Sequence, residues 1–450
     1  MSIFSSGFTQ NLPEKNWLIP SKAKRIIFLT MVGGPSQIDL FDYKPELAKM
    51  YGKELPDSIR KGQRLTTMTS NQEKLLLAPS KYNFQQHGQS GAWISELLPW
   101  TAKIVDELCI IKSVTTDQIN HDPAITFLQS GDHLPGRPSL GSWLSYGLGR
   151  SSQNLPDYIS TMPIWSSKLE AQALYQRLWG SGMLSSKYQG IVLRNSKTPV
   201  LYLNNPDGIN EDVRKIMINH LNELNRHHLK IKSDPEIETR IQQYELAQKM
   251  QFSIPNLIDL SKESKTTLDL YGSEVGKPDS FANHCIMARR MVEQGVRMVQ
   301  IFHRGWDQHF NLEKDLPKQC MDIDRACYGL ISDLKTRGML KDTLVAWGGE
   351  FGRTSYCQGR LLKNRYGRDH HPKCSTMWLA GGGIKPGISY GETDELGYNV
   401  ASNPVPMERL HATILNRMGI DHEKLSIRHK GLEVKLTGVE KQKVIIDLCL

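Results

Sequence analysis

A mainly apolar stretch opens residues 296–310, VRMVQIFHRGWDQHF, and gives way at once to polar and aromatic side chains. An apolar run of this kind predicts a buried strand. Asp307 and His309 stand where that strand stops. Ligands gather at the carboxyl ends of strands in mainly parallel sheets, so a carboxylate and an imidazole two residues apart can share one metal ion there. The alternative is an ordinary turn or helix cap.

Two later stretches repeat this pattern. Residues 343–354, TLVAWGGEFGRT, form an apolar run that ends in Glu350 and Arg353. The sequence GRDHHP then brings further polar side chains just before another apolar run: Asp369, His370 and His371. Buried imidazoles and carboxylates are costly unless they are paired or bind a metal, so three such strand ends predict one polar site.

The first strand of the fold is predicted at residues 25–32, and it breaks at Gly33, Gly34 and Pro35. Consecutive glycines after a strand either let the backbone approach a ligand closely or simply make a tight turn. Both alternatives remain open at this stage.

Two further segments complete the expected framework. Residues 87–100 predict a loop followed by a helix, whose packing side chains are Ile94, Leu97, Leu98 and Trp100, and residues 108–114 predict a second strand. His121 then opens a predicted helix that Gly131 closes. A helix N-terminus favours anions, and His121 at that point can bind a metal, donate a proton or cap the helix.

Helices alternate with strands along the chain, which predicts an α/β fold with a largely parallel sheet. We expect residues 1–22 to be a lead-in and residues 23–450 to form a single α/β domain. A strongly charged, mostly helical insertion is expected near residues 205–275, where apolar positions follow a period near 3.6.

The net charge of +9 favours an anionic partner, such as a sulfate or phosphate ester or another polyanion. The chain has no dense Lys/Arg block with interleaved aromatic residues, which argues against nucleic acid. Its seven cysteines form no C-x-x-C pair, so neither a disulfide framework nor a four-cysteine zinc site is expected. No run of 18 apolar residues predicts a membrane span, and the N-terminus does not read as a signal peptide.

Several motifs together resemble one family. They are GGPSQIDLFDYKPEL, HGQSGAWISELLPW, INHDPAITFLQSG, GRPSLGSWLSYGLG, RGWDQHFNL, GGEFGRT, GRDHHP and LAGGGIKPG. From about residue 24 to residue 435 the chain is identified as a member of the domain of unknown function 1501 family, which is abundant in planctomycetes and resembles the alkaline phosphatase superfamily. The resemblance implies a three-layer α/β/α sandwich, a metal site at the strand ends and, because family members often carry export leaders, a location in the periplasm or cell envelope.

The resemblance also implies site residues. Asp307, His309 and His370 match ligands of one superfamily metal site, and His121 falls near the position of the nucleophile. At the second site the superfamily's Asp-His-Gly is replaced by Glu350, Phe351 and Gly352, and the chain contains no C-x-P-x-R sequence. These departures argue against a two-metal phosphatase or a formylglycine sulfatase.

The function expected from these observations is hydrolysis of an anionic sulfate or phosphate ester, on a small molecule or a glycan, with one divalent metal. Zinc, calcium and magnesium are the candidates. Glu350 is a further ligand or a base, His121 a nucleophile or proton donor, and Arg353 an anion-binding group. The expected substrate-binding residues are Ser36, Asp39, Asn120 and His371. The alternative function is non-catalytic binding of a sulfated or other polyanionic glycan.

Overall fold

The computed structural model describes residues 15–167, 171–194, 205, 207–232, 235–363 and 365–450. Most of the N-terminal lead-in lies outside these residues. In the described part, no helix is both long enough and apolar enough to cross a membrane.

A central sheet organises the molecule, with strands in the order β12-β4-β11-β8-β1-β7-β5-β6 and β15 paired to β4. The parallel pairs β1–β7, β1–β8, β5–β7 and β5–β6 build its middle and one side, whereas β11 runs antiparallel to β4 and β8. The strand bounds are β1 Arg25–Met31, β4 Leu108–Thr115, β5 Tyr158–Thr161, β6 Ile191–Leu193, β7 Met298–His303, β8 Thr343–Gly348, β11 Ser375–Ala380, β12 Ile388–Tyr390 and β15 Val405–Pro406.

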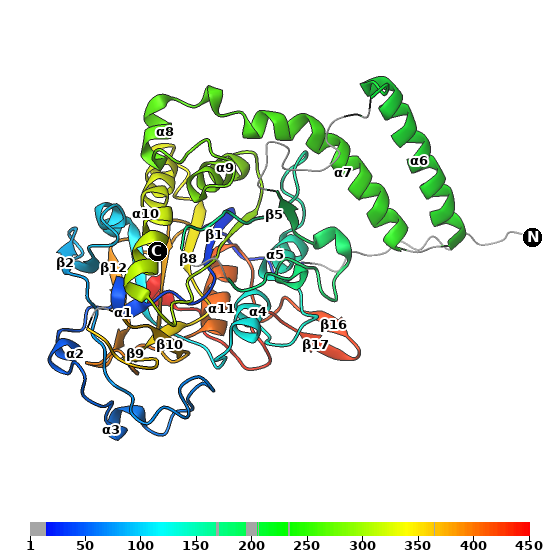
Figure 1. Cartoon of the computed structure of the whole chain (residues 1–450). Helices are drawn as coiled ribbons and strands as arrows, with labels where there is room; N and C mark the ends of the chain where they lie inside the picture. Colours follow the sequence, from blue (N-terminus) through cyan, green and yellow to red (C-terminus); the bar gives the residue numbers. More distant parts are fainter. Residues whose placement is uncertain (1–14, 168–170, 195–204, 206, 233–234, 364) are drawn as a thin grey trace, which may run out of the picture.

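Both faces of this sheet are covered by helices (Figure 1). In β1 successive side chains point to opposite faces, so Ile27 and Leu29 join one core cluster while Ile26 and Phe28 join the other. The first cluster is completed by α9 (Phe281–Glu293) and α10 (Leu312–Thr336). The second is completed by α4 (His121–Ser130), α5 (Leu140–Leu148) and α11 (Met407–Arg417). The predicted α/β fold with a mainly parallel sheet between helical layers is confirmed.

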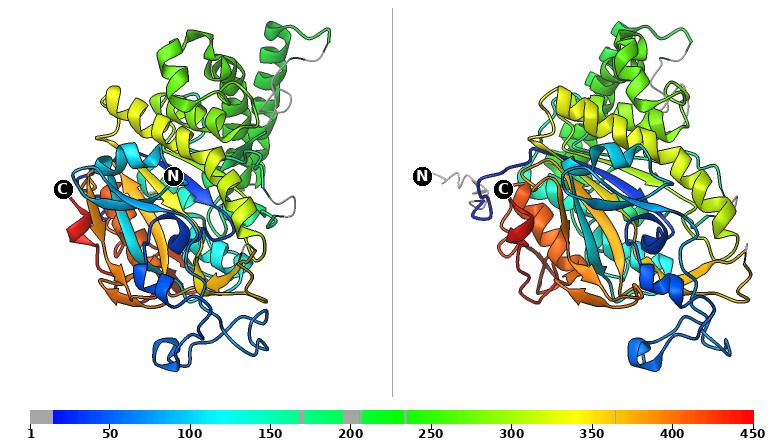
Figure 2. Two further views of the ribbon diagram at one scale, coloured as in Figure 1. Left: turned by 60° about the vertical axis from the view of Figure 1, so that its left-hand side comes forward. Right: turned by 90° about the vertical axis from the view of Figure 1, so that its left-hand side faces the viewer.

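The helical region predicted near residues 205–275 contains two long helices that project beyond the sandwich, as Figure 1 and Figure 2 show. They are α6 (Glu211–Lys232) and α7 (Pro235–Ile258), and α8 (Lys265–Tyr271) follows. The remaining short helices are α1 Gln37–Leu40, α2 Pro45–Lys49, α3 Asp57–Arg60, η1 Thr101–Glu107, η2 Gln176–Leu178, η3 Ser186–Tyr188, η4 Leu260–Lys262 and η5 Ile446–Leu448. The strands outside the central sheet are β2 Phe84–His87, β3 Ala92–Ser95, β9 Gly352–Cys357, β10 Arg368–His371, β13 Glu392–Thr393, β14 Val400–Ser402, β16 Ile427–His429 and β17 Leu432–Val434.

The prediction of a helix within residues 87–100 is wrong. Its expected packing residues were Ile94, Leu97, Leu98 and Trp100. This segment is the second strand of a β2–β3 hairpin, followed by turns and a 3₁₀ helix. The carboxylate of Asp106 accepts the N–H groups of Gln89 and Ser90 and so holds the hairpin loop. A short apolar run has no reliable periodicity, and the two glycines that flank this loop favour a hairpin.

Candidate metal centre

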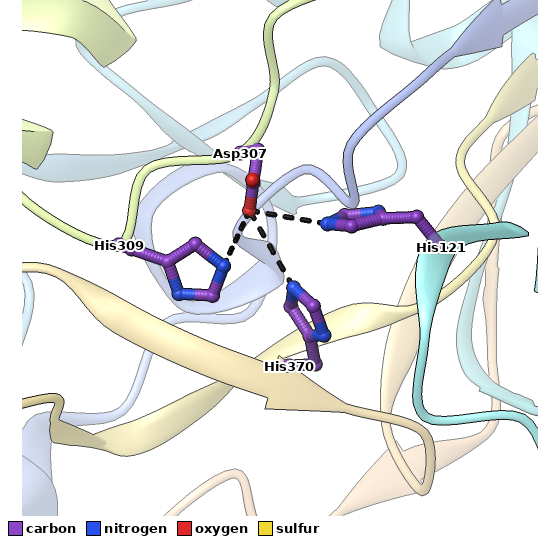
Figure 3. A group of neighbouring side chains, drawn as sticks. All are labelled: His121, Asp307, His309 and His370. Atoms are coloured by element: carbon purple, nitrogen blue, oxygen red, sulfur yellow. Dashed lines mark ion pairs between the residues drawn. The ribbon is translucent and has the colours of Figure 1, made fainter. Parts of the chain in front are cut away.

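Four side chains from three separate segments meet at the carboxyl edge of the sheet. His121 is the first residue of α4, Asp307 and His309 lie in the loop after β7, and His370 lies in β10. The Oδ1 atom of Asp307 lies 2.8 Å from Nε2 of His309, 3.2 Å from Nε2 of His121 and 3.5 Å from Nε2 of His370 (Figure 3). All four side chains are buried. We call this group the His3Asp cluster.

Close backbone approach brings the loop of Asp307 to this position. Gly33, just after β1, has φ of +121°, and a Cβ atom there would lie 2.8 Å from backbone atoms of Trp306 and Asp307. Gly367, just before β10, is equally crowded, because its Cβ atom would lie 1.9 Å from the carbonyl oxygen of His309. Glycine at both positions lets β1, the loop and β10 pack directly against one another.

His370 reaches the cluster through a hairpin. Strand β10 pairs antiparallel with β9, and His370 stands opposite Arg353 in this pairing. Strand β11 follows β10 and runs antiparallel to β8, so its start lies at the edge where the parallel strands end. This topology explains why the sequence around His370 precedes a strand rather than following one.

The second nitrogen of each imidazole faces a hydrogen-bond acceptor. Nδ1 of His121 lies 2.7 Å from Oε1 of Glu350, and Nδ1 of His370 lies 2.8 Å from the Ile119 carbonyl oxygen. Nδ1 of His309 lies 2.5 Å from Oε1 of Gln358. Because these acceptors carry no proton to give, each Nδ1 donates the hydrogen bond, and each Nε2 is the ring nitrogen left to face Asp307.

The three Nε2 atoms therefore converge on one carboxylate oxygen. Nε2 of His121 and Nε2 of His370 are buried and make no hydrogen bond within the described part of the chain, despite their short distances to Asp307. Burial lowers the pKa of His370 to about 3, with Arg353 adding to the effect, so this ring is neutral at physiological pH. Buried polar groups and charges are costly unless they are paired or bind a metal, and a cation at this point would satisfy both the carboxylate and the neutral ring of His370.

The spacing of the donor atoms suits such a cation. Ligands about 2.0–2.1 Å from a tetrahedral ion lie roughly 3.3 Å from one another. The distances of 2.8, 3.2 and 3.5 Å in the His3Asp cluster bracket this value, and its donor atoms all lie within 4.8 Å of one another. The cluster could therefore bind a metal ion.

The model of the family described as "Protein of unknown function (DUF1501)" matches residues 23–449, nearly the whole chain. The chain belongs to the DUF1501 family. No curated protein matches the sequence.

Solved structures with some likeness to this DUF1501 protein include sulfatases and phosphatases. The crystal structure of Ps i-CgsB in complex with k-i-k-neocarrahexaose shares 8% identity and a TM-score of 0.37, over 88% of this chain and 72% of that one. The PsFucS1 sulfatase from Pseudoalteromonas sp. shares 11% identity with a TM-score of 0.34, and the match covers 90% of this chain and 69% of that chain. A mutant of the TAB5 alkaline phosphatase with Mg bound shares 10% identity with a TM-score of 0.33, and the match covers 89% of this chain and 99% of that chain.

Glu350 lies beside the His3Asp cluster of this DUF1501 protein. Its Oε1 atom accepts the backbone N–H of Gly33 at 2.9 Å and faces Nδ1 of His121. The side chain is fully buried, and its Oε2 atom has no hydrogen-bond partner among the described residues. The structure therefore places Glu350 in contact with one imidazole of the cluster, and its expected role as a ligand or base stays a prediction.

Arg353 is buried and bonded to the protein itself. Its Nη2 atom donates to Oδ1 of Asp307 at 2.7 Å, and its Nε atom donates to the Gly34 carbonyl oxygen at 2.9 Å. Burial alone would raise the pKa of Asp307, but Arg353 and the three imidazoles hold it well below its usual range. The carboxylate is thus fixed in its charged form.

The expected substrate-binding residues lie nearby in different surroundings. Ser36 donates to Asp39 at 2.5 Å, and Asp39 pairs with Arg368 at 2.7 Å. His371 points away from His370, because adjacent strand residues face opposite sides, and its Nε2 atom lies 2.6 Å from the Tyr398 carbonyl oxygen. Asn120 precedes α4 and makes no side-chain cap bond there. Substrate binding by these residues stays a prediction.

Two glutamines at the cluster carry no sequence signal. Gln358 follows β9 and orients His309, and Gln172 lies in a segment far from the other site residues in sequence. Nε2 of Gln172 donates to Oδ2 of Asp307 at 3.3 Å. Neither residue belongs to a recognisable motif, so only the folded chain reveals them.

Proposed function

We propose that this protein is a metal-dependent hydrolase of an anionic ester, and that one divalent ion is held by the His3Asp cluster. The observation that carries the proposal is the convergence of three Nε2 atoms on Oδ1 of Asp307, with every Nδ1 atom bonded to an acceptor. Hydrogen bonding of the distal ring nitrogen is the usual arrangement for metal-ligating histidines.

The donor set of three nitrogens and one oxygen favours zinc, or another late divalent transition metal, over the hard cations calcium and magnesium. His121 then belongs with the ligands rather than acting as a nucleophile. Glu350 fixes the tautomer of His121, and its second carboxylate oxygen is a candidate proton acceptor. The ion itself would supply Lewis-acid polarisation of the ester.

The charge balance supports an anionic substrate. Asp307 and Glu350 contribute two negative charges, Arg353 one positive charge, and a divalent ion would leave a local excess of one positive charge. The N-terminus of the ten-residue helix α4 opens at His121 and adds the positive end of its dipole. A sulfate or phosphate ester, free or on a glycan, fits this environment, and the net charge of +9 acts in the same direction.

A specific observation favours a second candidate. Four protein donors complete a tetrahedral shell, which is typical of structural metal sites, whereas catalytic zinc keeps an open position. A binding protein for a polyanionic glycan, built around a closed metal centre, is therefore the alternative.

Elemental analysis of the purified protein tests the metal centre first. We expect about one equivalent of transition metal in the wild type and its loss in His370→Ala. The control is His133→Ala, at an exposed position, which should keep the metal. Absence of bound metal after incubation with zinc would sink the proposal.

Cobalt substitution and turnover separate the two functions. We expect aryl sulfate or phosphate esters to be hydrolysed and the visible spectrum of the cobalt form to show five-coordination upon ester binding. A four-coordinate spectrum that no ester perturbs, together with no turnover, would favour the binding protein.

A further inference from the structure

Helix α6 exposes an apolar stripe along its whole length. The side chains that form it, with their exposed fractions, are Val213 42%, Ile216 55%, Met217 54%, Leu221 38%, Leu224 57% and Ile231 65%. Isolated exposed apolar side chains are normal, but a continuous row on one element marks an interaction surface. We call this row the α6 stripe.

The stripe faces away from the rest of the molecule. On an α-helix with 100° per residue, the more buried positions Ile218, Asn222 and Leu229 lie on the side opposite Leu224. Arg226 reaches from α6 to Glu245 of α7 at 3.5 Å. Helix α7 therefore covers the more polar face of α6, and Figure 1 shows α6 at the outer edge of the molecule, beyond α7.

Four residues of the stripe lie, together with two histidines, at the spacing of a coiled coil. Alternating steps of four and three residues connect Val213, Met217, His220, Leu224, His227 and Ile231. This is the a/d seam of three heptads, which pairs with another helix of the same kind through knobs-into-holes packing. An amphipathic helix in a membrane interface often carries Trp or Phe on its apolar face, and the α6 stripe contains neither.

We propose that α6 pairs in parallel with α6 of a second copy of this chain, forming a two-fold symmetric dimer. In a parallel pair, position g of one helix meets position e of its partner in the next heptad. This places Glu223 beside His228 and Ile216 beside Leu221 across the interface. An antiparallel pair would instead bring Glu223 against itself.

The position of α7 permits this arrangement. Because the stripe lies opposite the α7 face, the bodies of the two copies fall on opposite sides of the seam. Helix α6 has 22 residues and spans roughly 33 Å, which is long enough for three a positions and three d positions in the seam. The inference is independent of the metal centre and of the proposed function.

Sedimentation equilibrium of the full chain tests the dimer. We expect a monomer–dimer equilibrium in the wild type and at least a tenfold higher dissociation constant in Leu224→Glu, because a charge would enter the seam. The control variant Asn219→Glu, exposed on the same helix but outside the stripe, should dimerise like the wild type. A wild type that stays monomeric, or a dimer that Leu224→Glu leaves unchanged, would overturn the proposal.

Cross-linking tests the orientation. All seven native cysteines are buried and unpaired, so Leu224→Cys adds one exposed thiol. Parallel pairing predicts a disulfide-linked dimer of this variant under mild oxidation, and no such dimer for Asn219→Cys. Absence of the Leu224→Cys dimer, combined with efficient cross-linking between His220→Cys and Leu224→Cys chains, would contradict parallel pairing. If wild-type chains bound anionic vesicles through α6 while staying monomeric, the stripe would be a membrane-binding surface and the dimer proposal would be wrong.

Discussion

Glu350 receives the N–H of Gly33 and faces Nδ1 of His121 with the same carboxylate oxygen, at 2.9 and 2.7 Å. One carboxylate thereby links the segment just after β1 to the first residue of α4. Because this link connects His121 to the segment after β1, we expect Glu350 to influence metal binding at the His3Asp cluster.

The variant Glu350→Gln should weaken metal binding by about 10–100-fold, as removal of outer hydrogen-bond partners does in other metal sites. Glutamine keeps the shape of the side chain but removes the charge that favours the Nδ1–H form of His121. Competition with a chromophoric chelator measures the affinity, and Glu423→Gln, at an exposed position, is the matched control. Equal affinity in Glu350→Gln and the wild type would show that this link does not act on the metal.

Removal of metal should lower the thermal stability of the wild type. A ligand that binds only the folded state at 100 times its Kd stabilises that state by about 2.7 kcal/mol. A chelator should therefore lower the Tm of the wild type and leave the Tm of His370→Ala unchanged in differential scanning fluorimetry. An equal effect of the chelator on both proteins would contradict a cation at the His3Asp cluster.

The variant Gly33→Ala should disrupt both the fold and the centre. Its new Cβ atom would meet backbone atoms of Trp306 and Asp307 at 2.8 Å, with φ of +121°. Backbone atoms cannot move aside as a flexible side chain can, so we expect a loss of at least about 2 kcal/mol in the free energy of unfolding, together with weaker metal binding. Denaturant titration measures the loss.

Gly62 provides the control for this substitution. It also has a positive φ, +66°, but nothing lies within 4 Å of its Cβ position. The variant Gly62→Ala should therefore lose only about 1 kcal/mol, from backbone strain. If the two variants lost the same stability, crowding at Gly33 would not be the cause.

The stability of the protein should fall as the pH drops from about 6.5 to about 4. Burial lowers the pKa of His411 to about 4, while its Nε2 atom keeps a hydrogen bond to the Leu128 carbonyl oxygen at 2.8 Å. In this window the unfolded chain takes up the proton more readily than the folded chain, so protonation favours unfolding, by at most roughly 1.4 kcal/mol per pH unit.

Comparison of slopes isolates His411 from the other buried histidines. In urea titrations across this pH range, His411→Gln should show a shallower decrease in the free energy of unfolding than the wild type. His133→Gln, at an exposed position, should retain the wild-type slope. An unchanged slope in His411→Gln would mean that this residue is protonated equally in both states.

Much of the framework follows from local pattern. The strands around Leu29, Ile301 and Val345 are largely apolar runs, which are typical of strands buried on both faces of a sheet. The hairpin at Ile94 could not be predicted from the apolar pattern, because a run of four residues fits a strand and a helical turn equally well until its neighbours are known.

For the site, the sequence by itself determined that donors such as Asp307 and His309 follow a buried strand, and that two adjacent histidines, His370 and His371, stand near another. Only the tertiary structure decided which of these rings faces Asp307, because the pleat of β10 sends one ring to the His3Asp cluster and the other to Tyr398. It also decided that His121 joins them. The orientation of each imidazole depends on contacts between residues that lie 49 to 251 positions apart, and no local pattern of apolar and polar residues encodes those contacts.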